Sequence, residues 1–412
     1  MKKAWFVGVA LVAPLALTAC GDSGTGGGGA TGGGSGETIK IASLHPLSGA
    51  AAADGQQMDN GAKLAAEAIN AAGGIKSLGG AKIEIVSADS QGKPEVGQSE
   101  AQRVIQDGAV GIVGAYQSAV SANIATVAER NKVPFVIDVS SADSILSQGY
   151  KYTFRVQPSA SVIGQQGAQY LFDMSKAAGK PVKKVAFLHE QGPFGTGVRD
   201  AFTKKATELG FEVGPALSYD AASVADLTTQ MTQVKASGAD VLAVTGYYRD
   251  GVLVAKAVNS VKPPVNAVYG VANGAFDLPQ FPKETGAAGE GYFDANYHPD
   301  YTKQTTKDLA ALYKSKYNDD IRTGAVLSYD AVRVLADAME RAKSKEPQKI
   351  REAITQTNLE SLMAQSGPIA FDEKGENKGA IPILMQVQKG VVNQVWPADL
   401  AQAEPTYPAM GG

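Results

Sequence analysis

The chain has 412 residues, of which 44% are hydrophobic and 19% are charged, and its formal net charge is −3. This length is enough to bury a core and suggests two domains or more, while the single cysteine excludes an intramolecular disulfide. Because the charge is weakly negative and no basic face stands out, nucleic acid is not an expected partner.

The first twenty residues have the pattern of an export signal that ends at a cysteine. Lys2 and Lys3 precede an apolar run over residues 4–17, which is too short to span a bilayer comfortably. Small residues then lead to Cys20, and this segment resembles the lipobox of bacterial lipoproteins. We therefore predict a signal peptide over residues 1–19 and a lipid on the Cys20 thiol. The alternative is an ordinary secretory peptide with an incidental cysteine.

A linker is predicted next, because residues 21–36 are almost all Gly, Ser, Thr and Ala. Such a stretch buries too little apolar surface to fold, so residues 20–37 are expected to carry the anchor and a flexible coil. Its reach is roughly 20 Å. No later apolar run has the length of a membrane span, so the lipid is the only expected attachment to a bacterial membrane, in a periplasm or at a cell surface.

From residue 38 onward, short apolar strands alternate with helices. The predicted strands are residues 39–44, 82–88, 110–114, 133–139, 184–188, 212–217, 240–246 and 266–270. The predicted helices are residues 57–72, 94–107, 121–131, 161–176, 195–209, 225–237 and 249–260. This alternation predicts two α/β units with parallel sheets that are covered on both faces.

The pattern changes near Pro299. Two long helices are predicted over residues 302–317 and 328–343. A hairpin follows, with strands over residues 382–388 and 391–396 around Lys389-Gly390.

Five motifs then carry a family resemblance. In chain order they are Ile39–Ala42 with Pro46–Gly49, the helix end Ile69–Ile75, Gly246-Tyr247, Tyr329–Val332 and Gly367–Gly375. Together they resemble the leucine/isoleucine/valine-binding protein family, the branched-chain amino acid type of extracytoplasmic solute-binding protein. The similarity runs from about residue 38 to residue 396.

The resemblance implies a type I periplasmic-binding-protein fold, an α/β fold with two doubly wound parallel-sheet lobes joined by three hinge crossings. The crossings are expected near residues 157–159, 287–292 and 365–368. Lobe 1 would contain residues 38–157 and 291–365, lobe 2 residues 158–290 and 366–400, and residues 401–412 would form a tail. Such lobes close by a hinge motion around a ligand. An ABC permease that is coupled to an ATPase would recognise the closed monomer.

The ligand site is expected beyond the carboxyl ends of the strands, where open parallel sheets bind ligands. Serine hydroxyls and helix N-termini in these loops suit a carboxylate, and tyrosines suit an apolar body with one polar tip. The loops contain Ser48, Gly49, Asp54, Tyr116, Gln117, Ser118, Val139, Ser140, Ser141, Phe194, Tyr247, Tyr248 and Asn273.

The family pattern implies roles for some of these residues. Ser118 and Ser141 match the serine or threonine positions that meet the ligand carboxylate, and the Val139 carbonyl would accept from its ammonium. Tyr247 matches a tyrosine of the second lobe. Phe194 stands where the family often has tyrosine, so a hydroxyl is lost there.

One departure concerns the ligand's ammonium group. Leucine-type binders place an acidic residue after a strand of the second lobe, whereas residues 270–274 contain none. A buried ammonium without a counter-charge is costly, so either Asp54 or Asp138 substitutes or the ligand lacks an ammonium. The aromatic side chains near the site would also fit an aromatic acid.

An enzyme is not indicated. The three histidines do not form a His-Glu-x-x-His motif, no Gly-x-Ser-x-Gly elbow is present, and the glycine-rich residues 192–197 lack the Lys-Ser/Thr of a phosphate loop. We therefore expect no catalytic residue, metal or cofactor. The main alternative is a sensor lipoprotein that binds an aromatic acid, an amide or a short peptide.

Overall fold

The computed structural model describes residues 38–410. The predicted signal peptide, the Cys20 anchor and the linker lie outside the described residues. Among the helices of residues 38–410, none has the length and apolar character needed to cross a membrane.

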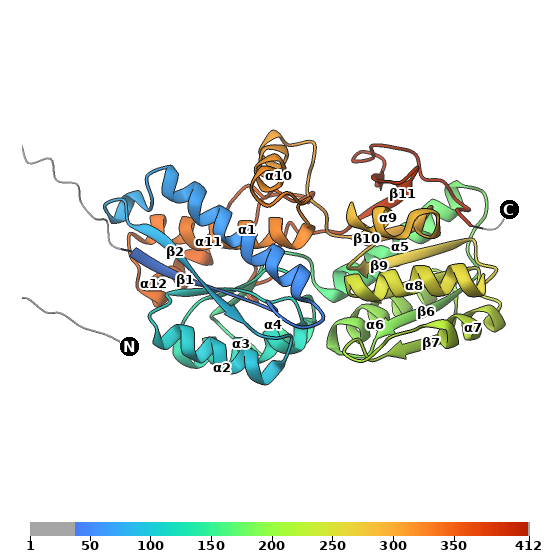
Figure 1. Ribbon diagram of the computed structural model, residues 1–412, viewed down its shortest axis with the longest axis horizontal. Coiled ribbons are helices and arrows are strands. Elements are labelled where there is room, and N and C mark those ends of the chain that lie inside the picture. Colours follow the sequence, from blue (N-terminus) through green and yellow to red (C-terminus); the bar gives the residue numbers. More distant parts are fainter. Residues whose placement is uncertain (1–37, 411–412) are drawn as a thin grey trace, which may run out of the picture. The chain divides into compact units, whose positions relative to one another are not determined.

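The first lobe, which contains the strands labelled β1 and β2 in Figure 1, is built on a parallel sheet. Its five strands follow the order β2-β1-β3-β4-β5. Alternate residues of β1 point to opposite faces, so Ile39 and Ile41 enter one core and Ala42 and Leu44 enter the other. The strands are β1 (Thr38–His45), β2 (Lys82–Asp89), β3 (Gly111–Gly114), β4 (Phe135–Ile137) and β5 (Thr153–Arg155).

Helices cover both faces of this sheet. One core contains residues of α1 and α11, and the other contains residues of α2 and α3. The helices of the first lobe are α1 (Ala52–Ala71), α2 (Pro94–Gln106), α3 (Ser118–Asn131), α4 (Asp143–Leu146), α10 (Gln304–Tyr317), α11 (Thr323–Ala342) and α12 (Pro347–Ile354).

The second lobe has a sheet of seven strands in the order β12-β11-β10-β9-β8-β6-β7. Five strands are parallel, and the hairpin of β11 and β12 joins them antiparallel at one edge. The strands are β6 (Lys184–Glu190), β7 (Glu212–Tyr219), β8 (Val241–Gly246), β9 (Ala267–Asn273), β10 (Phe293–Asn296), β11 (Ile383–Gln388) and β12 (Val391–Trp396).

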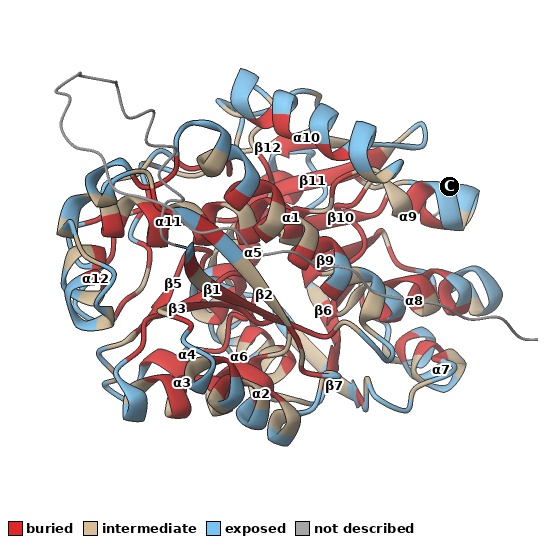
Figure 2. Ribbon diagram, turned by 60° about the vertical axis from the view of Figure 1, so that its left-hand side comes forward, coloured by how far each residue is buried: buried red, intermediate tan, exposed pale blue. Residues whose placement is uncertain are grey.

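Helices again form two cores with this sheet, and buried residues concentrate on the strands and on the inward sides of the helices (Figure 2). The predicted fold class of two parallel-sheet lobes is thus confirmed. Tyr407 of the tail packs into one of these cores. The helices are α5 (Ala160–Ala177), α6 (Pro193–Glu208), α7 (Thr228–Ser237), α8 (Tyr248–Val261) and α9 (Gln280–Thr285).

The chain passes between the two sheets three times, but two crossings lie later than predicted. The boundary at residue 291 is wrong because β10 pairs with β9 in the second sheet, so the second crossing follows Asn296. The boundary at residue 366 is also wrong, because Ile369 and Phe371 are buried in the first lobe's core. Both segments are too short to show a periodicity in the sequence, and tertiary contacts decide where they pack.

Three helix starts also differ from the prediction. α1, α3 and α11 begin several residues before residues 57, 121 and 328, where the sequence pattern placed them. Their first turns are rich in Gly, Ala and Ser, which resemble loops in composition. This difference matters because these first turns border the candidate site described below.

The close packing of α1 on α11 can be tested at Gly61. A Cβ at this position would lie 2.1 Å from the Ala325 carbonyl oxygen, so Gly61→Ala forces the two helices apart. We expect the free energy of unfolding to fall by about 1–3 kcal/mol or more in urea denaturation.

Gly197→Ala in helix α6 is the matched control, since a Cβ there would lie 3.4 Å from the Ala160 Cβ of helix α5, which is an ordinary van der Waals distance. Alanine is the better helix former, so this variant should lose nothing or gain up to about 1 kcal/mol. Equal losses in the two variants would contradict the packing described here.

Candidate functional site

Three adjoining cavities lie where loops of the two lobes meet. The first, called the serine cavity, has a volume of about 20 Å³ and is lined by Tyr116, Ser118, Val139, Ser140, Ser141, Phe194, Gly246, Tyr247, Ala272, Gly274 and Tyr297. The structure thus brings together seven of the thirteen loop residues named for the predicted site, drawn from loops after β3, β4, β6 and β8.

The second, called the arginine cavity, has a volume of about 40 Å³. It shares Tyr116, Val139, Gly274 and Tyr297 with the serine cavity and adds Asp54, Met58, Asp277, Leu278, Asn296, Arg322, Thr323, Gly324 and Ala325. The third, called the outer cavity, is larger at about 510 Å³, and its wall includes Asp54, Gln117, Ser118, Glu190, Phe194, Tyr247 and Asp250.

The hydroxyls of the serine cavity differ in their hydrogen bonds. Ser141 Oγ is buried without a partner, whereas Ser140 Oγ is bonded to Ser121 Oγ. Ser118 Oγ accepts from the Ala142 amide at 3.2 Å and therefore keeps its own proton free to donate. Ser118 is also the first residue of α3, whose first amides have no acceptor within the helix. This wall is rich in donors and suits an anion.

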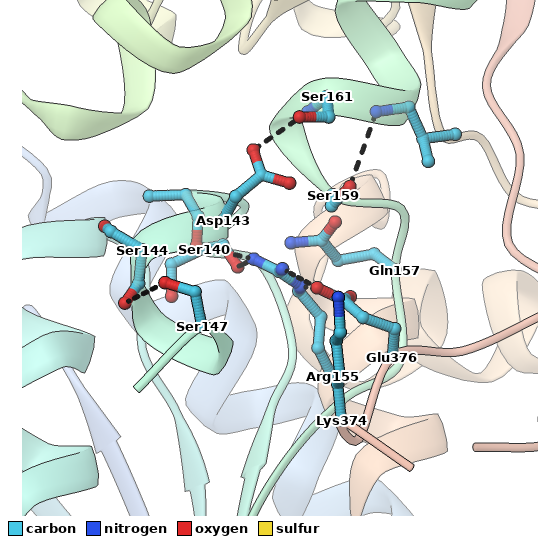
Figure 3. Close-up of polar contacts among 12 residues, drawn as sticks. Ser140, Asp143, Ser144, Ser147, Arg155, Gln157, Ser159, Ser161, Lys374 and Glu376 are labelled. Atoms are coloured by element: carbon cyan, nitrogen blue, oxygen red, sulfur yellow. Dashed lines mark hydrogen bonds and ion pairs between the residues drawn. The ribbon is translucent and has the colours of Figure 1, made fainter. Parts of the chain in front are cut away.

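A buried cation fixes the loop that carries Ser141 (Figure 3). Arg155 has no exposed surface, and its Nη1 donates to the carbonyls of Ser140 and Ala142 at 3.3 and 3.1 Å. Its Nε donates to Glu376 at 3.0 Å. The same loop is tied to the start of α5, because the Ser161 amide donates to the Asp143 carboxylate at 3.0 Å.

The Val139 carbonyl, which the family pattern assigns to a ligand ammonium, already has one donor. Gln157 Nε2 donates to it from the first crossing. A carbonyl oxygen has two lone pairs, so one acceptor site remains.

Aromatic rings from both lobes close over the serine cavity. The ring centroids of Tyr116 and Tyr247 lie 5.1 Å apart, and those of Phe194 and Tyr247 lie 5.6 Å apart. Phe194 lies in the first turn of α6 and Tyr247 directly precedes α8, so these two rings belong to the second lobe. They face the serines of the first lobe.

The two acids considered as counter-charges are already engaged. Asp138 is fully buried and is bonded to His45 Nε2 at 2.6 Å, to Ser328 Oγ at 2.6 Å and to the Val139 amide at 2.8 Å. Asp54 pairs with Arg322. Neither carboxylate is therefore free to balance the charge of a ligand cation.

Asn273 and Gln117, which were also predicted at the site, do not line the serine cavity. Asn273 does not line any of the three cavities, because its side chain turns back and accepts from the Ala275 amide at 3.1 Å. Gln117 lines the outer cavity, and its buried Oε1 has no partner.

Sequence reasoning missed three charged residues of these walls. Arg322 directly precedes α11 and was hidden because that helix was predicted to begin at residue 328. Glu190 accepts from the amides of Gly192 and Gly195, both at 2.6 Å, and Asp250 accepts from the Tyr247 amide at 3.0 Å. Glu190 ends β6 and Asp250 lies in the first turn of α8, where the rule of strand ends could have found them.

Burial is the main influence on both acids. It raises the pKa of Glu190 against the opposing effect of its two amide donors. It also raises the pKa of Asp250 to about 6. Within residues 38–410, no group of three or more His, Cys, Asp or Glu side chains is arranged to hold a metal ion.

Asp250 makes stability depend on pH. Its pKa is near 3.8 when unfolded and about 6 when folded, so the folded state binds more protons between these values. Stability should therefore fall by up to about 3 kcal/mol as the pH rises from 4 to above 6. In urea denaturation across this range, Asp250→Asn should make this decline smaller, because the contribution of Asp250 is lost while an amide oxygen still accepts from Tyr247. The rest of the decline comes from other acids whose pKa burial raises, such as Asp54, Glu190 and Asp330.

The control is Asp220→Asn, which removes an exposed acid of the outer cavity whose pKa is lowered mainly by the Ser223 hydroxyl. This variant should keep the decline. Parallel pH profiles for wild type and Asp250→Asn would show that Asp250 is not the group responsible.

Comparison with known proteins gives one consistent result. A family model described as periplasmic binding protein matches residues 38–390. The Leu/Ile/Val-binding protein homolog 8 of Brucella melitensis is 27% identical over 380 residues, which cover 89% of this chain and 92% of the relative.

Solved structures agree with this match. A leucine-binding protein from Thermotoga maritima superposes with a TM-score of 0.75 at 27% identity, covering 87% of this chain and 98% of the other. A solute-binding protein of an ABC transporter from R. palustris, solved with benzoate, has a TM-score of 0.73 at 18% identity, covering 87% and 95%, which is a likeness of fold. Since the family model matches most of the chain, the protein belongs to the periplasmic binding protein family, among the leucine/isoleucine/valine-binding proteins that its motifs resemble.

Proposed function

We propose that the protein captures a small carboxylate, such as an amino acid of the branched-chain type, between its two lobes and delivers it to an ABC importer. One observation carries the proposal: the Ser141 hydroxyl is buried without a partner in a cavity walled by both lobes. A carboxylate placed there would accept from Ser141, from Ser118 and from the first amides of α3.

The second lobe would cover the bound ligand. Phe194 and Tyr247 would cover the ligand and exclude water once the hinge segments bring the lobes together. An amino acid would direct its ammonium to the free lone pair of the Val139 carbonyl, since the carboxylates of Asp54 and Asp138 are engaged. A permease with its ATPase would then recognise the closed form.

The site in this proposal consists of residues from both lobes. Ser118, Ser141 and Val139 would hold the charged end of the ligand, and Tyr116, Phe194 and Tyr247 its body. Ser140 supports the wall, whereas Gln117 and Asp54 border the neighbouring cavities.

A second candidate is a receptor for an aromatic acid. The rings of Tyr116, Phe194 and Tyr247 around one cavity favour it, and the R. palustris neighbour was solved with benzoate. The ligand panel below includes benzoate for this reason.

Both candidates share an extracytoplasmic location. The signal segment supports export, and Cys20 supports a lipid anchor. The glycine-rich linker would let a monomeric binding protein, anchored in this way, reach its transporter.

Ligand-linked stabilisation tests the binding function. The thermal unfolding of residues 38–412 should be measured with amino acids, short hydroxy and oxo acids, amides, short peptides and benzoate. A ligand at about a hundred times its dissociation constant should stabilise the fold by about 2.7 kcal/mol. The proposal fails if no member of the panel shifts the transition.

Calorimetry of the same ligand with Ser141→Ala locates the site. Loss of a hydroxyl that meets a charged oxygen should weaken binding by about 1–3 kcal/mol. Ser144→Ala, an exposed position in the same segment, should leave the affinity unchanged. An unaltered affinity in Ser141→Ala would remove this hydroxyl from the site.

Metabolic labelling tests the anchor. The full chain, expressed in bacteria with radiolabelled palmitate, should carry the label, whereas Cys20→Ala should not, because the thiol is the acceptor of the lipid. Ser23→Ala should keep the label. Incorporation into Cys20→Ala would contradict a lipid on this cysteine.

A further inference from the structure

We propose that the ligand is a short carboxylic acid with a second, uncharged oxygen acceptor, which the Arg322 guanidinium binds in the arginine cavity. This inference rests on the proposed function, because it places the ligand carboxylate at Ser141. It adds a second recognition point and a limit on size.

The two cavities form one path for a ligand. Tyr116, Val139, Gly274 and Tyr297 line both the serine cavity and the arginine cavity. A molecule whose carboxylate meets Ser118 and Ser141 therefore directs its other end toward Arg322.

Each end of this path has one buried donor without a partner. In the serine cavity it is Ser141 Oγ, and in the arginine cavity, within the described residues, it is Arg322 Nε. Buried donors are normally satisfied in folded proteins, so both point to an acceptor that a ligand brings.

The carboxylate and amide side chains of the arginine cavity are already bonded. Asp277 accepts from Thr323 Oγ1 at 3.1 Å and is bonded to His298 Nδ1 at 3.3 Å. Asn296 donates to the Asn273 carbonyl at 3.3 Å and accepts from the Tyr297 amide at 3.0 Å. Arg322 Nε thus remains a buried charged donor of this wall that lacks an acceptor.

Charge decides which acceptor fits. Arg322 Nη1 is paired with Asp54 and the wall also contains Asp277, so it has no spare positive charge. A second carboxylate would bring an uncompensated buried charge, which is expensive, whereas a hydroxyl, keto or amide oxygen accepts from Nε without adding charge. A hydroxy acid, an oxo acid or the half-amide of a short diacid has this chemistry.

Arg322 is held by both lobes. Its amide donates to Gln57 Oε1 of α1 at 2.8 Å, which fixes the backbone to the first lobe. Its guanidinium lies 4.5 Å from the ring centroid of Tyr248, which belongs to the second lobe. Closure therefore completes the environment of the guanidinium at the same time as it covers the ligand.

The volume of the two inner cavities sets the size of a ligand that stays within them. The cavities measure about 20 and about 40 Å³, and one water-sized group needs at least about 10–15 Å³ on this measure. Together they hold about four to six non-hydrogen atoms. This is the size of glycolate, lactate or glyoxylate, whereas the branched side chain of leucine would extend into the outer cavity, which shares Ser118, Phe194 and Tyr247 with the serine cavity.

Calorimetry with matched acids tests the inference. Lactate and propionate share a carbon skeleton and differ in one hydroxyl, and malonate carries a second charge. Wild type should bind lactate at least about tenfold more tightly than propionate, malonate or leucine, as a hydrogen bond to a charged donor predicts. Asp54→Asn/Arg322→Gln should abolish the difference between lactate and propionate.

Lys283→Gln is the matched control, because it removes a neighbouring exposed cation that pairs with Asp320 across the lobes. It should keep the preference for lactate. Circular dichroism reports whether the double variant folds. If it does not, Arg322→Lys, which keeps the charge but has a methylene instead of an N–H donor at the position of Nε, should show the same loss.

Two outcomes overturn this inference. One is equal affinity of wild type for lactate and propionate. The other is tighter binding of leucine than of lactate, with an affinity for leucine that substitution of Arg322 leaves unchanged. The proposed function survives in that case, provided that Ser141→Ala weakens the binding. Absence of binding by every acid of the panel overturns the proposed function itself.

Discussion

A guanidinium buried away from water must satisfy its charge inside the protein, and Arg155 does so in a way that fixes one wall of the cleft. It holds two carbonyls of the loop that carries Ser141 and pairs with Glu376, which lies beyond the two long helices of the first lobe. A segment from the end of the chain is thereby joined to the loop after β4. Because a buried charge without its partner is strongly destabilising, this geometry tolerates little movement.

Two unpaired donors border the cleft in this lobe. Ser141 Oγ and Arg322 Nε are both buried without acceptors, and both belong to the first lobe. The second lobe contributes aromatic covers, namely Phe194 and Tyr247 over the serines and Tyr248 over the arginine. The first lobe thus presents hydrogen-bond donors, and the second lobe excludes water. A binding protein that closes around its ligand requires both.

Much of this could be predicted from the sequence. Alternating apolar strands and helices predicted two parallel sheets, and the ends of strands β3, β4 and β8 located Ser118, Ser141 and Tyr247 at one cavity. β10 could not be predicted, because four residues show no periodicity and only the neighbouring β9 places them in the second sheet. Arg322 was missed because its helix begins in a stretch of small residues. Asn273, predicted at the site, lies outside the three cavities because its side chain accepts from the Ala275 amide.

The central claim is that the cleft between the lobes binds the ligand through the donors of the first lobe. A crystal structure of the protein with its tightest-binding acid tests this most directly. We expect one carboxylate oxygen within hydrogen-bond distance of Ser141 Oγ, with the ligand covered by Phe194 and Tyr247. A ligand bound outside this cleft, or one that leaves the Ser141 hydroxyl without a partner, would contradict the account.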